Sequence, residues 1–140
     1  MKDLSSNIHV ARAISPVSEA GTTALVSQVI DRRGYDSLTF VIATGSIADA
    51  DATFTVLVED GSASDLTGGA AVADAELIGT EVLAGFQFDD DNEVRKIGYI
   101  GNQRYVRLTV TPVANASAAL ISAVAILGHP TISPTANPPV

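Results

Sequence analysis

The sequence predicts an all-β fold: a single antiparallel β-sandwich or jelly-roll-like domain of about eight short strands. Segments of strand length either alternate apolar with polar residues or run apolar, and they recur roughly every 8–15 residues. Glycine, aspartate and asparagine lie between them, as is typical of turns. No segment shows a strong helical period, which the crossover helices of a parallel sheet would require. With 140 residues, one domain is the simplest expectation.

Each strand candidate has either two distinct faces or a short apolar run. The clearest is the segment in which Phe54, Val56 and Val58 share one face while Thr53 and Thr55 share the other. In chain order the candidates are residues 7–14, 23–30, 37–44, 52–59, 81–88, 93–100, 103–112 and 118–128.

The sixth and seventh candidates are separated by a very short loop. Because such a loop allows a tight turn, the sequence predicts that residues 94–112 form a β-hairpin. In its second strand, apolar residues from Val106 to Val110 alternate with Arg107 and threonines. One face would therefore enter the core, and we expect the arginine face to meet water, a nucleic acid or another protein.

The eighth candidate has an ambiguous pattern. Residues 118–127 are apolar on both faces, so they fit either a central strand or a short buried helix. Three β-branched residues favour the strand, namely Ile121, Val124 and Ile126.

Composition and charge exclude several classes of function. The 46% of hydrophobic residues argues against global disorder, and the lack of cysteine excludes disulfides, thiolate metal sites and thiol catalysis. A net charge of −8 repels nucleic-acid phosphates, so no nucleic-acid partner is predicted. The apolar run at 117–127 is far shorter than the roughly 20 residues of a membrane-spanning helix, so no membrane partner is predicted either.

No pattern in the sequence predicts catalysis or a cofactor. It lacks a nucleophile elbow, a zinc-binding HExxH motif and a phosphate-binding loop, and His9 and His129 lie near opposite ends. The acids Asp49 and Asp51, and those within 89–93, offer oxygen ligands suited to Ca²⁺ but lack the EF-hand spacing. Solvated turns are the favoured interpretation, and whether Ca²⁺ binds stays open. We expect a protein that is not an enzyme.

The cations are the first candidate partner contacts. If the hairpin forms, four of them would share a small area, and two more lie in a turn. An acidic protein partner and an ordinary solvated strand face explain such a cluster equally well, whereas a nucleic acid fits an acidic chain poorly. The six candidate residues are Arg32, Arg33, Arg95, Lys96, Arg104 and Arg107.

The C-terminal segment is the second candidate contact. Residues 131–140 carry no charge and are rich in proline, so we expect an extended arm outside a sandwich domain of residues 1–130. Proline-rich segments lose little entropy on docking, which suits an arm that binds a neighbouring chain. Its candidate contacts are Ile132, Pro134, Pro138 and Pro139.

Several blocks of the chain resemble a family of small structural proteins from the heads of tailed bacteriophages. They are "RRGYDSLTFVIATGSIADADATFTVLVEDG", "ADAELIGTE", "VRKIGYIGNQRYVRLTVTP" and "AVAILGHP", and the resemblance covers about residues 1–130. It implies a capsid decoration or cement protein with a β-sandwich fold, located on the outer capsid surface of the virion. It also implies that the chain bridges subunits of the major capsid protein, and we expect a homotrimer.

Within this expectation the arginine face meets protein, either the capsid shell or a sister subunit, and charge reversal of Arg104 and Arg107 should abolish particle binding. Two alternatives stay open. One is another virion position: a head-fibre base, a head–tail component or a tail component. The other is a carbohydrate-binding module for host attachment, although such sites stack sugars on exposed aromatic rings and this chain has no tryptophan.

Overall fold

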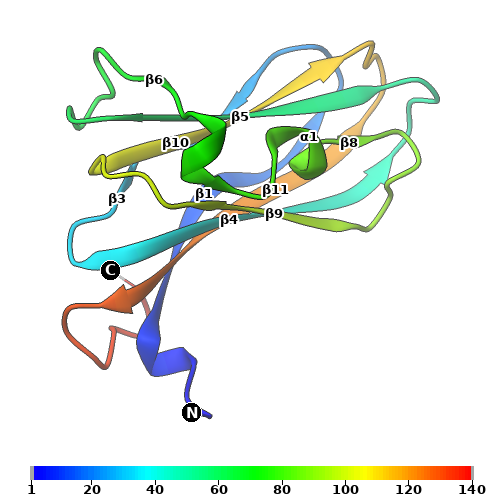
Figure 1. Cartoon of the computed structure of the whole chain (residues 1–140). Helices are drawn as coiled ribbons and strands as arrows, with labels where there is room; N and C mark the ends of the chain where they lie inside the picture. The colour runs from blue at the N-terminus through cyan, green and yellow to red at the C-terminus, as the bar shows by residue number, and fades with distance from the viewer. Residues whose placement is uncertain (1, 140) are drawn as a thin grey trace.

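The computed structural model describes residues 2–139, which form two antiparallel β-sheets packed face to face (Figure 1). Sheet A has the strand order β1-β11-β4-β9-β7, and sheet B has the order β2-β10-β5-β6, with β3 paired to β10 and β8 paired to β5. The strands are β1 (Ile8–Glu19), β2 (Leu25–Val26), β3 (Ile30–Asp31), β4 (Tyr35–Ile47), β5 (Thr53–Gly61), β6 (Ala70–Ala71), β7 (Leu77–Ile78), β8 (Phe86–Gln87), β9 (Val94–Tyr99), β10 (Tyr105–Val113) and β11 (Ala119–Pro130). Short helical turns are η1 (Ser5–Asn7), η2 (Asp74–Glu76) and α1 (Glu81–Ala84). The prediction of an all-β sandwich is confirmed.

The core lies between the two sheets and follows the alternation seen in the sequence. On β10 the side chains of Val106, Leu108 and Val110 are fully buried, while Arg107 between them is not. The same period buries alternate residues of β4, β5 and β9 against them. Its largest fully buried side chains are Tyr99, Phe40, Phe54, Leu38, Ile42, Ile97, Leu108, Ile121 and Leu127.

The ambiguous segment 118–127 is a strand. It forms most of β11, which lies between β1 and β4 at the centre of sheet A. Ala119, Ile121, Ala123, Ala125 and Leu127 are buried on the inner face. The alternate side chains of β11 are also largely apolar, and they point to the outside of the sandwich.

The predicted hairpin at 94–112 is wrong. β9 pairs with β4 and β7 in sheet A, whereas β10 pairs with β5, β2 and β3 in sheet B. The loop between them crosses from one sheet to the other over the ring of Tyr99. A Cβ on Gly101 would lie 2.5 Å from the Tyr99 hydroxyl, so only glycine allows this close passage. The Tyr99 hydroxyl also accepts a hydrogen bond from the Gln103 backbone N–H at 3.0 Å, which holds the crossing in place.

Two other strand candidates are shorter in the structure than the sequence predicts. Residues 81–84 form the single helical turn α1, because the Thr80 hydroxyl accepts the Leu83 N–H at 3.0 Å and caps it. Only Phe86 and Gln87 of that candidate pair with β5. Candidate 23–30 is interrupted at Ser27, whose buried hydroxyl accepts the Leu108 N–H, so β2 and β3 pair separately with β10.

The proline-rich segment after Pro130 folds back beside the N-terminal segment and does not extend away from the sandwich. Pro130 still belongs to β11 and lies opposite Tyr35 on β4. Beyond it the chain turns back along the N-terminal segment, where the Thr135 N–H donates to the Ser6 carbonyl at 2.9 Å. Figure 1 shows the segment that follows β11, in red, beside the blue N-terminal helical turn η1, below the body of the sandwich.

Candidate functional site

Sheet A exposes a broad, nearly uncharged surface. Residues that pair across antiparallel strands share a face, so the register identifies the outward positions. One row of paired residues runs from Arg12 through Val124 and Val41 to Lys96. We define the outer face of sheet A as this row and its outward neighbours: Val10, Arg12, Thr39, Val41, Ala43, Ile78, Val94, Lys96, Gly98, Leu120, Ser122, Val124 and Ile126.

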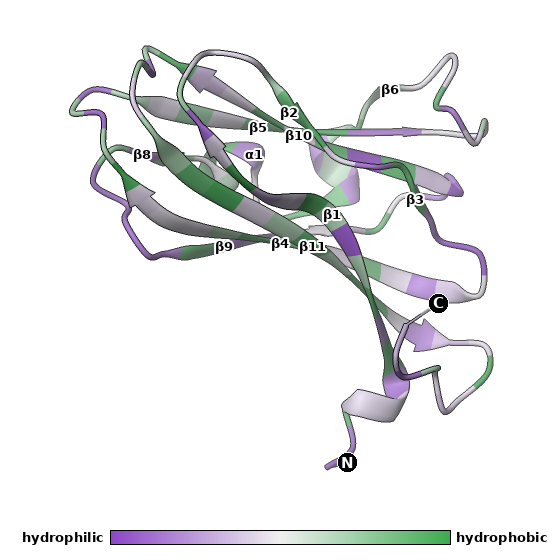
Figure 2. Ribbon diagram, turned by 180° about the vertical axis from the view of Figure 1, so that it is seen from behind, coloured by the Kyte–Doolittle hydropathy of each residue, from purple (hydrophilic) through white to green (hydrophobic). Residues whose placement is uncertain are grey.

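The outer face of sheet A is apolar to an extent unusual for a solvated surface. Val94 is 61% exposed, Ile78 60%, Leu120 44% and Val124 36%. Figure 2 shows hydrophobic residues along β1, β4 and β11 of this sheet. Single exposed apolar residues are common, but a contiguous group over several strands is typical of a protein contact surface.

Shallow hollows add relief to this surface. One of about 480 Å³ is lined by Ile78, Leu83, Lys96 and Ile100 at the β7 edge. Another of about 330 Å³ lies beside Leu120, where β11 and β1 meet the end of β4. Hollows among exposed aliphatic side chains suit the projecting side chains of a protein partner.

Charge on the outer face of sheet A has one sign. None of its positions is acidic, although the chain has 16 acidic residues, and its charged residues are the cations Arg12 and Lys96. Arg12 donates to the Ser15 hydroxyl at 2.9 Å and to Gln28. Within residues 2–139 neither cation has an ion-pair partner. Both charges are therefore available to a binding partner.

The arginine face of β10 is the outer face of sheet B, and it is paired within the chain. Arg107 lies opposite Glu59 in the β10–β5 register, and Arg107 Nη2 lies 2.9 Å from Glu59 Oε1. Thr55, Thr109 and Thr111 surround this pair on the two strands. The charges of this face are therefore paired within the chain, and its threonines lie among the exposed Val26, Leu57 and Val113, whereas within residues 2–139 the face of sheet A has no internal ion pair.

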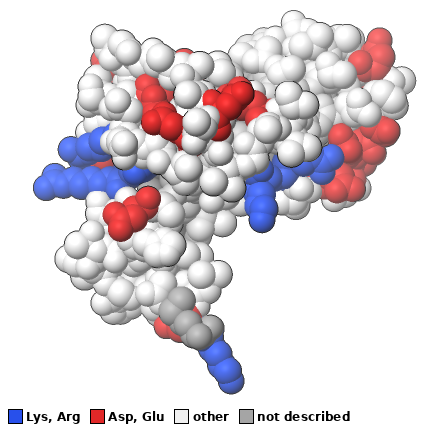
Figure 3. All heavy atoms as spheres, in the orientation of Figure 1, with Lys and Arg blue, Asp and Glu red and all other residues white. Residues whose placement is uncertain are grey.

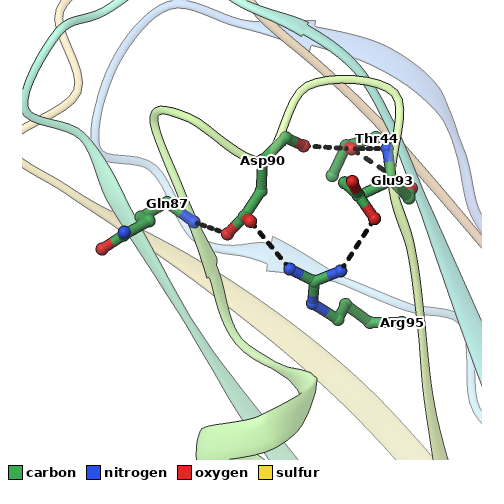
Figure 4. A network of polar contacts seen from close by, with 5 residues as sticks. All are labelled: Thr44, Gln87, Asp90, Glu93 and Arg95. Carbon is green, nitrogen blue, oxygen red and sulfur yellow. Dashed lines mark hydrogen bonds and ion pairs between the residues drawn. The ribbon is translucent and has the colours of Figure 1, made fainter.

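Arg95 lies at the start of β9, within a network of polar contacts made by the preceding loop (Figure 4). Its Nη2 atom lies 2.8 Å from Asp90 Oδ1, and its Nη1 atom lies 3.4 Å from Glu93 Oε2. Asp90 also accepts the Gln87 N–H, and its carbonyl accepts the Thr44 hydroxyl. Arg95 thus closes the loop between β8 and β9, and both of its charged neighbours come from its own chain.

Arg104 and the two turn arginines lie at the opposite end of the molecule from Arg95. Arg104 makes a bidentate ion pair with Asp31, with both N–O distances at 2.8 Å, and this pairing lowers the pKa of Asp31. The Arg32 guanidinium lies 4.8 Å from the centroid of the Tyr99 ring. The side chain of Arg33 is exposed and has no ion pair among the described residues.

The expectation that the cations share one small area is therefore wrong, because it depended on the hairpin. Arg95 and Lys96 lie in sheet A, and Arg104 and Arg107 lie at or in sheet B. Figure 3 shows the basic residues in separate places on the molecule. That these cations contact a partner stays a prediction, and Lys96 alone of the six lies on the outer face of sheet A.

The tail candidates lie close to the N-terminal segment. Ile132 is 80% exposed, and Pro134, Pro138 and Pro139 are exposed as well. Hydrogen bonds from Ser133 and Thr135 to Ser6 hold this segment against its own chain. Whether it also contacts a neighbouring chain stays a prediction.

The acidic loops use their carboxylates to order the backbone. Asp49 accepts the Ala116 N–H at 2.7 Å, and a hydrogen bond from Asp51 lowers the pKa of Asp49 and raises that of Asp51. Asp91 accepts the Ile47 N–H at 2.9 Å. Among the described residues no group of three or more His, Cys, Asp or Glu side chains could hold a metal ion.

Of the positions on the outer face of sheet A, the sequence analysis named Lys96 as a partner contact and missed the others, Arg12, Val41 and Val124 among them. The sequence of β11 did indicate this surface, because the apolar residues of that strand occupy both of its faces. A strand of a two-layer sandwich has one face in the core, so apolar residues on its other face indicate a second contact.

Comparisons with known proteins give structural likenesses only. No protein-family model matches the chain, and no curated protein matches its sequence. The SPBc2 prophage-derived protein YomS is similar with a TM-score of 0.44 and 15% identity, over 84% of this chain and 94% of that one. The cyanophage Pam1 capsid asymmetric unit has a TM-score of 0.46 and 16% identity, over 91% and 89% of the two chains. The xylan-binding module CBM15 has a TM-score of 0.41 and 12% identity, over 93% and 95%.

These likenesses are too weak to carry an argument about function, which has to come from the residues of this chain. One general exclusion also follows from the structure. No helix among the described residues has the length and apolar character needed to cross a membrane.

Proposed function

We propose that the chain is a non-enzymatic structural protein of a tailed-phage virion. In this proposal it binds the outer surface of the capsid, contacts subunits of the major capsid protein and stabilises the shell by bridging them. The resemblance of its sequence blocks to small phage head proteins supports this assignment. A rigid sandwich with an exposed apolar face is also what a bridging protein requires.

The observation that carries the proposal is the contrast between the two outer faces. The outer face of sheet A combines exposed valine, leucine and isoleucine with two unpaired cations and no acid. The outer face of sheet B is rich in threonine and contains the internal Arg107–Glu59 pair. Sheet A therefore offers the surface that gains most by burial against another protein.

The same surface does not favour carbohydrate binding. Sugar sites stack pyranose rings on exposed aromatic side chains, and no position of the outer face of sheet A is aromatic. Attachment at a unique vertex is the nearer alternative, and copy number separates it from decoration of the whole lattice.

A titration of the purified chain against undecorated capsids of the phage that encodes it tests the proposal. We expect saturable binding at many copies spread over the lattice, because a bridging protein has a site at every equivalent capsomer junction. Thermal release of the packaged genome should then move to a higher temperature, since the bound state is stabilised by mass action. Binding of only a few copies at one vertex, or no binding, would contradict the proposal.

A further inference from the structure

The central row of the outer face of sheet A has a charge pattern that constrains its partner. Arg12, Val124, Val41 and Lys96 follow one another across four strands through direct pairings. Neighbouring strands lie about 4.8 Å apart, so the backbones at the two cations are about 14 Å apart. The row therefore presents a positive charge at each end and two valines between them.

Burying this row against a purely apolar surface would be unfavourable. Each cation would lose its hydration without gaining a partner, and uncompensated buried charges are costly. Within the described residues no acid of the chain itself lies near enough to pair with Arg12 or Lys96. The compensating carboxylates have to come from the binding partner.

The same pattern argues against a second copy of the chain docked on this face. In a symmetric dimer the two-fold axis lies in the plane of the interface. An axis along the strands through the middle of the row would place Arg12 over Lys96 of the other copy. An axis along the row would place each cation over its own equivalent. Both arrangements bring like charges together, which disfavours the contact.

The net charge of the whole chain adds an orienting effect. At −8 the chain is repelled by an acidic surface everywhere except where acids are absent and cations are present. The outer face of sheet A meets both conditions. An acidic partner would therefore bind this face in preference to the other surfaces of the chain.

We propose that the outer face of sheet A binds an acidic protein surface, in which carboxylates lie opposite Arg12 and Lys96 and flank an apolar strip that packs on Val124 and Val41. This inference rests on the proposed function and specifies the chemistry of the capsid surface that the chain recognises. Binding then depends on two ion pairs at the ends of an apolar contact. It should weaken with salt and with charge reversal at either end.

The test uses two variants matched in net charge, in the titration against undecorated capsids. Arg12→Glu with Lys96→Glu reverses both charges of the row, and Lys2→Glu with Thr55→Glu and Ser64→Glu makes the same change in net charge at exposed positions off the face. We expect at least about a tenfold loss of affinity for the first variant and less than about a twofold change for the second. Raising NaCl from about 50 mM to about 500 mM should weaken capsid binding by the wild type. The same change in salt should have little effect on capsid binding by the double variant Arg12→Gln with Lys96→Gln.

The possible results separate this inference from the proposed function. If the wild type fails to bind capsids, the proposed function is wrong and the inference falls with it. If the wild type binds but the row variant and the control variant lose affinity equally, net charge and not the row is responsible, which overturns the inference alone. It is also overturned if charge reversal of the row leaves binding intact. Dissociation of a free oligomer by Val124→Asp would overturn it as well, because the face would then join copies of the chain.

Discussion

Val124→Asp is expected to weaken capsid binding by at least about 30-fold, which corresponds to about 2 kcal/mol. Val124 lies at the centre of the outer face of sheet A, between Arg12 on β1 and Val41 on β4. A carboxylate there would be buried against the partner without a hydrogen-bonding group of its own, and such burial is strongly unfavourable. In the free chain the same side chain is 36% exposed, so the carboxylate stays hydrated and the fold tolerates it.

A matched variant separates the effect on binding from the effect on the strand. Thr55→Asp places the same poor strand former on β5, at an exposed position on the outer face of sheet B. It should bind capsids like the wild type. Val124→Thr, which keeps the shape of the side chain but reduces its apolar surface, should show an intermediate loss. Equal losses for Val124→Asp and Thr55→Asp, measured on chains with unchanged circular dichroism, would mean that sheet A is not the contact.

Tyr99→Phe is expected to lower the free energy of unfolding by about 1–3 kcal/mol. Tyr99 is 1% exposed, and its hydroxyl donates to Asp60 Oδ2 at 2.6 Å and accepts the Gln103 N–H at 3.0 Å. Tyr99 belongs to sheet A and Asp60 to sheet B, so this hydrogen bond ties the two layers together. Phenylalanine keeps the packing but removes the donor from Asp60 and the acceptor from Gln103. Chemical denaturation at neutral pH measures the difference.

The same tyrosine should make the protein sensitive to alkali. Burial, and then the hydrogen bond to Asp60, raise the pKa of Tyr99 from 10.0 to about 12. Above pH 10 the unfolded chain loses this proton while the folded chain retains it, so stability falls as the pH rises from about 10 to about 12. Between pH 8 and pH 11 the wild type should lose more stability than Tyr99→Phe. Identical losses in the two proteins would show that this proton is not linked to unfolding.

The sequence predicted which face of a strand enters the core better than it predicted which strand pairs with which. Alternation identified Val106, Leu108 and Val110 as core residues because side-chain direction has a strict period along a strand. The partner of Arg107 could not be read in the same way. Glu59 lies opposite it only because β5 and β10 pair in one particular register, and this pairing joins residues far apart in the chain.

The predicted hairpin between β9 and β10 shows that a preference set by loop length can be overridden by tertiary contacts. A short loop favours a hairpin, but the buried Tyr99 ring and the hydrogen bond from Gln103 divert the chain into the other sheet. No feature of the loop itself indicates that Tyr99 would be held by Asp60 across the sandwich. The expectation that the candidate cations share one small area was wrong for the same reason, because it depended on the hairpin. The outer face of sheet A could have been anticipated from β11, because that strand is apolar on both faces.

Hydroxyl-radical footprinting of the chain, free and bound to capsids, tests the central claim most directly. Radicals oxidise exposed aliphatic side chains, and the two outer faces offer comparable probes: Leu120 and Val94 on sheet A are 44% and 61% exposed, and Leu57 and Val26 on sheet B are 36% and 53% exposed. We expect binding to protect Leu120 and Val94 from oxidation and to leave Leu57 and Val26 unchanged. Protection of Leu57 and Val26 with continued oxidation of Leu120 and Val94 would contradict the assignment of sheet A as the contact surface.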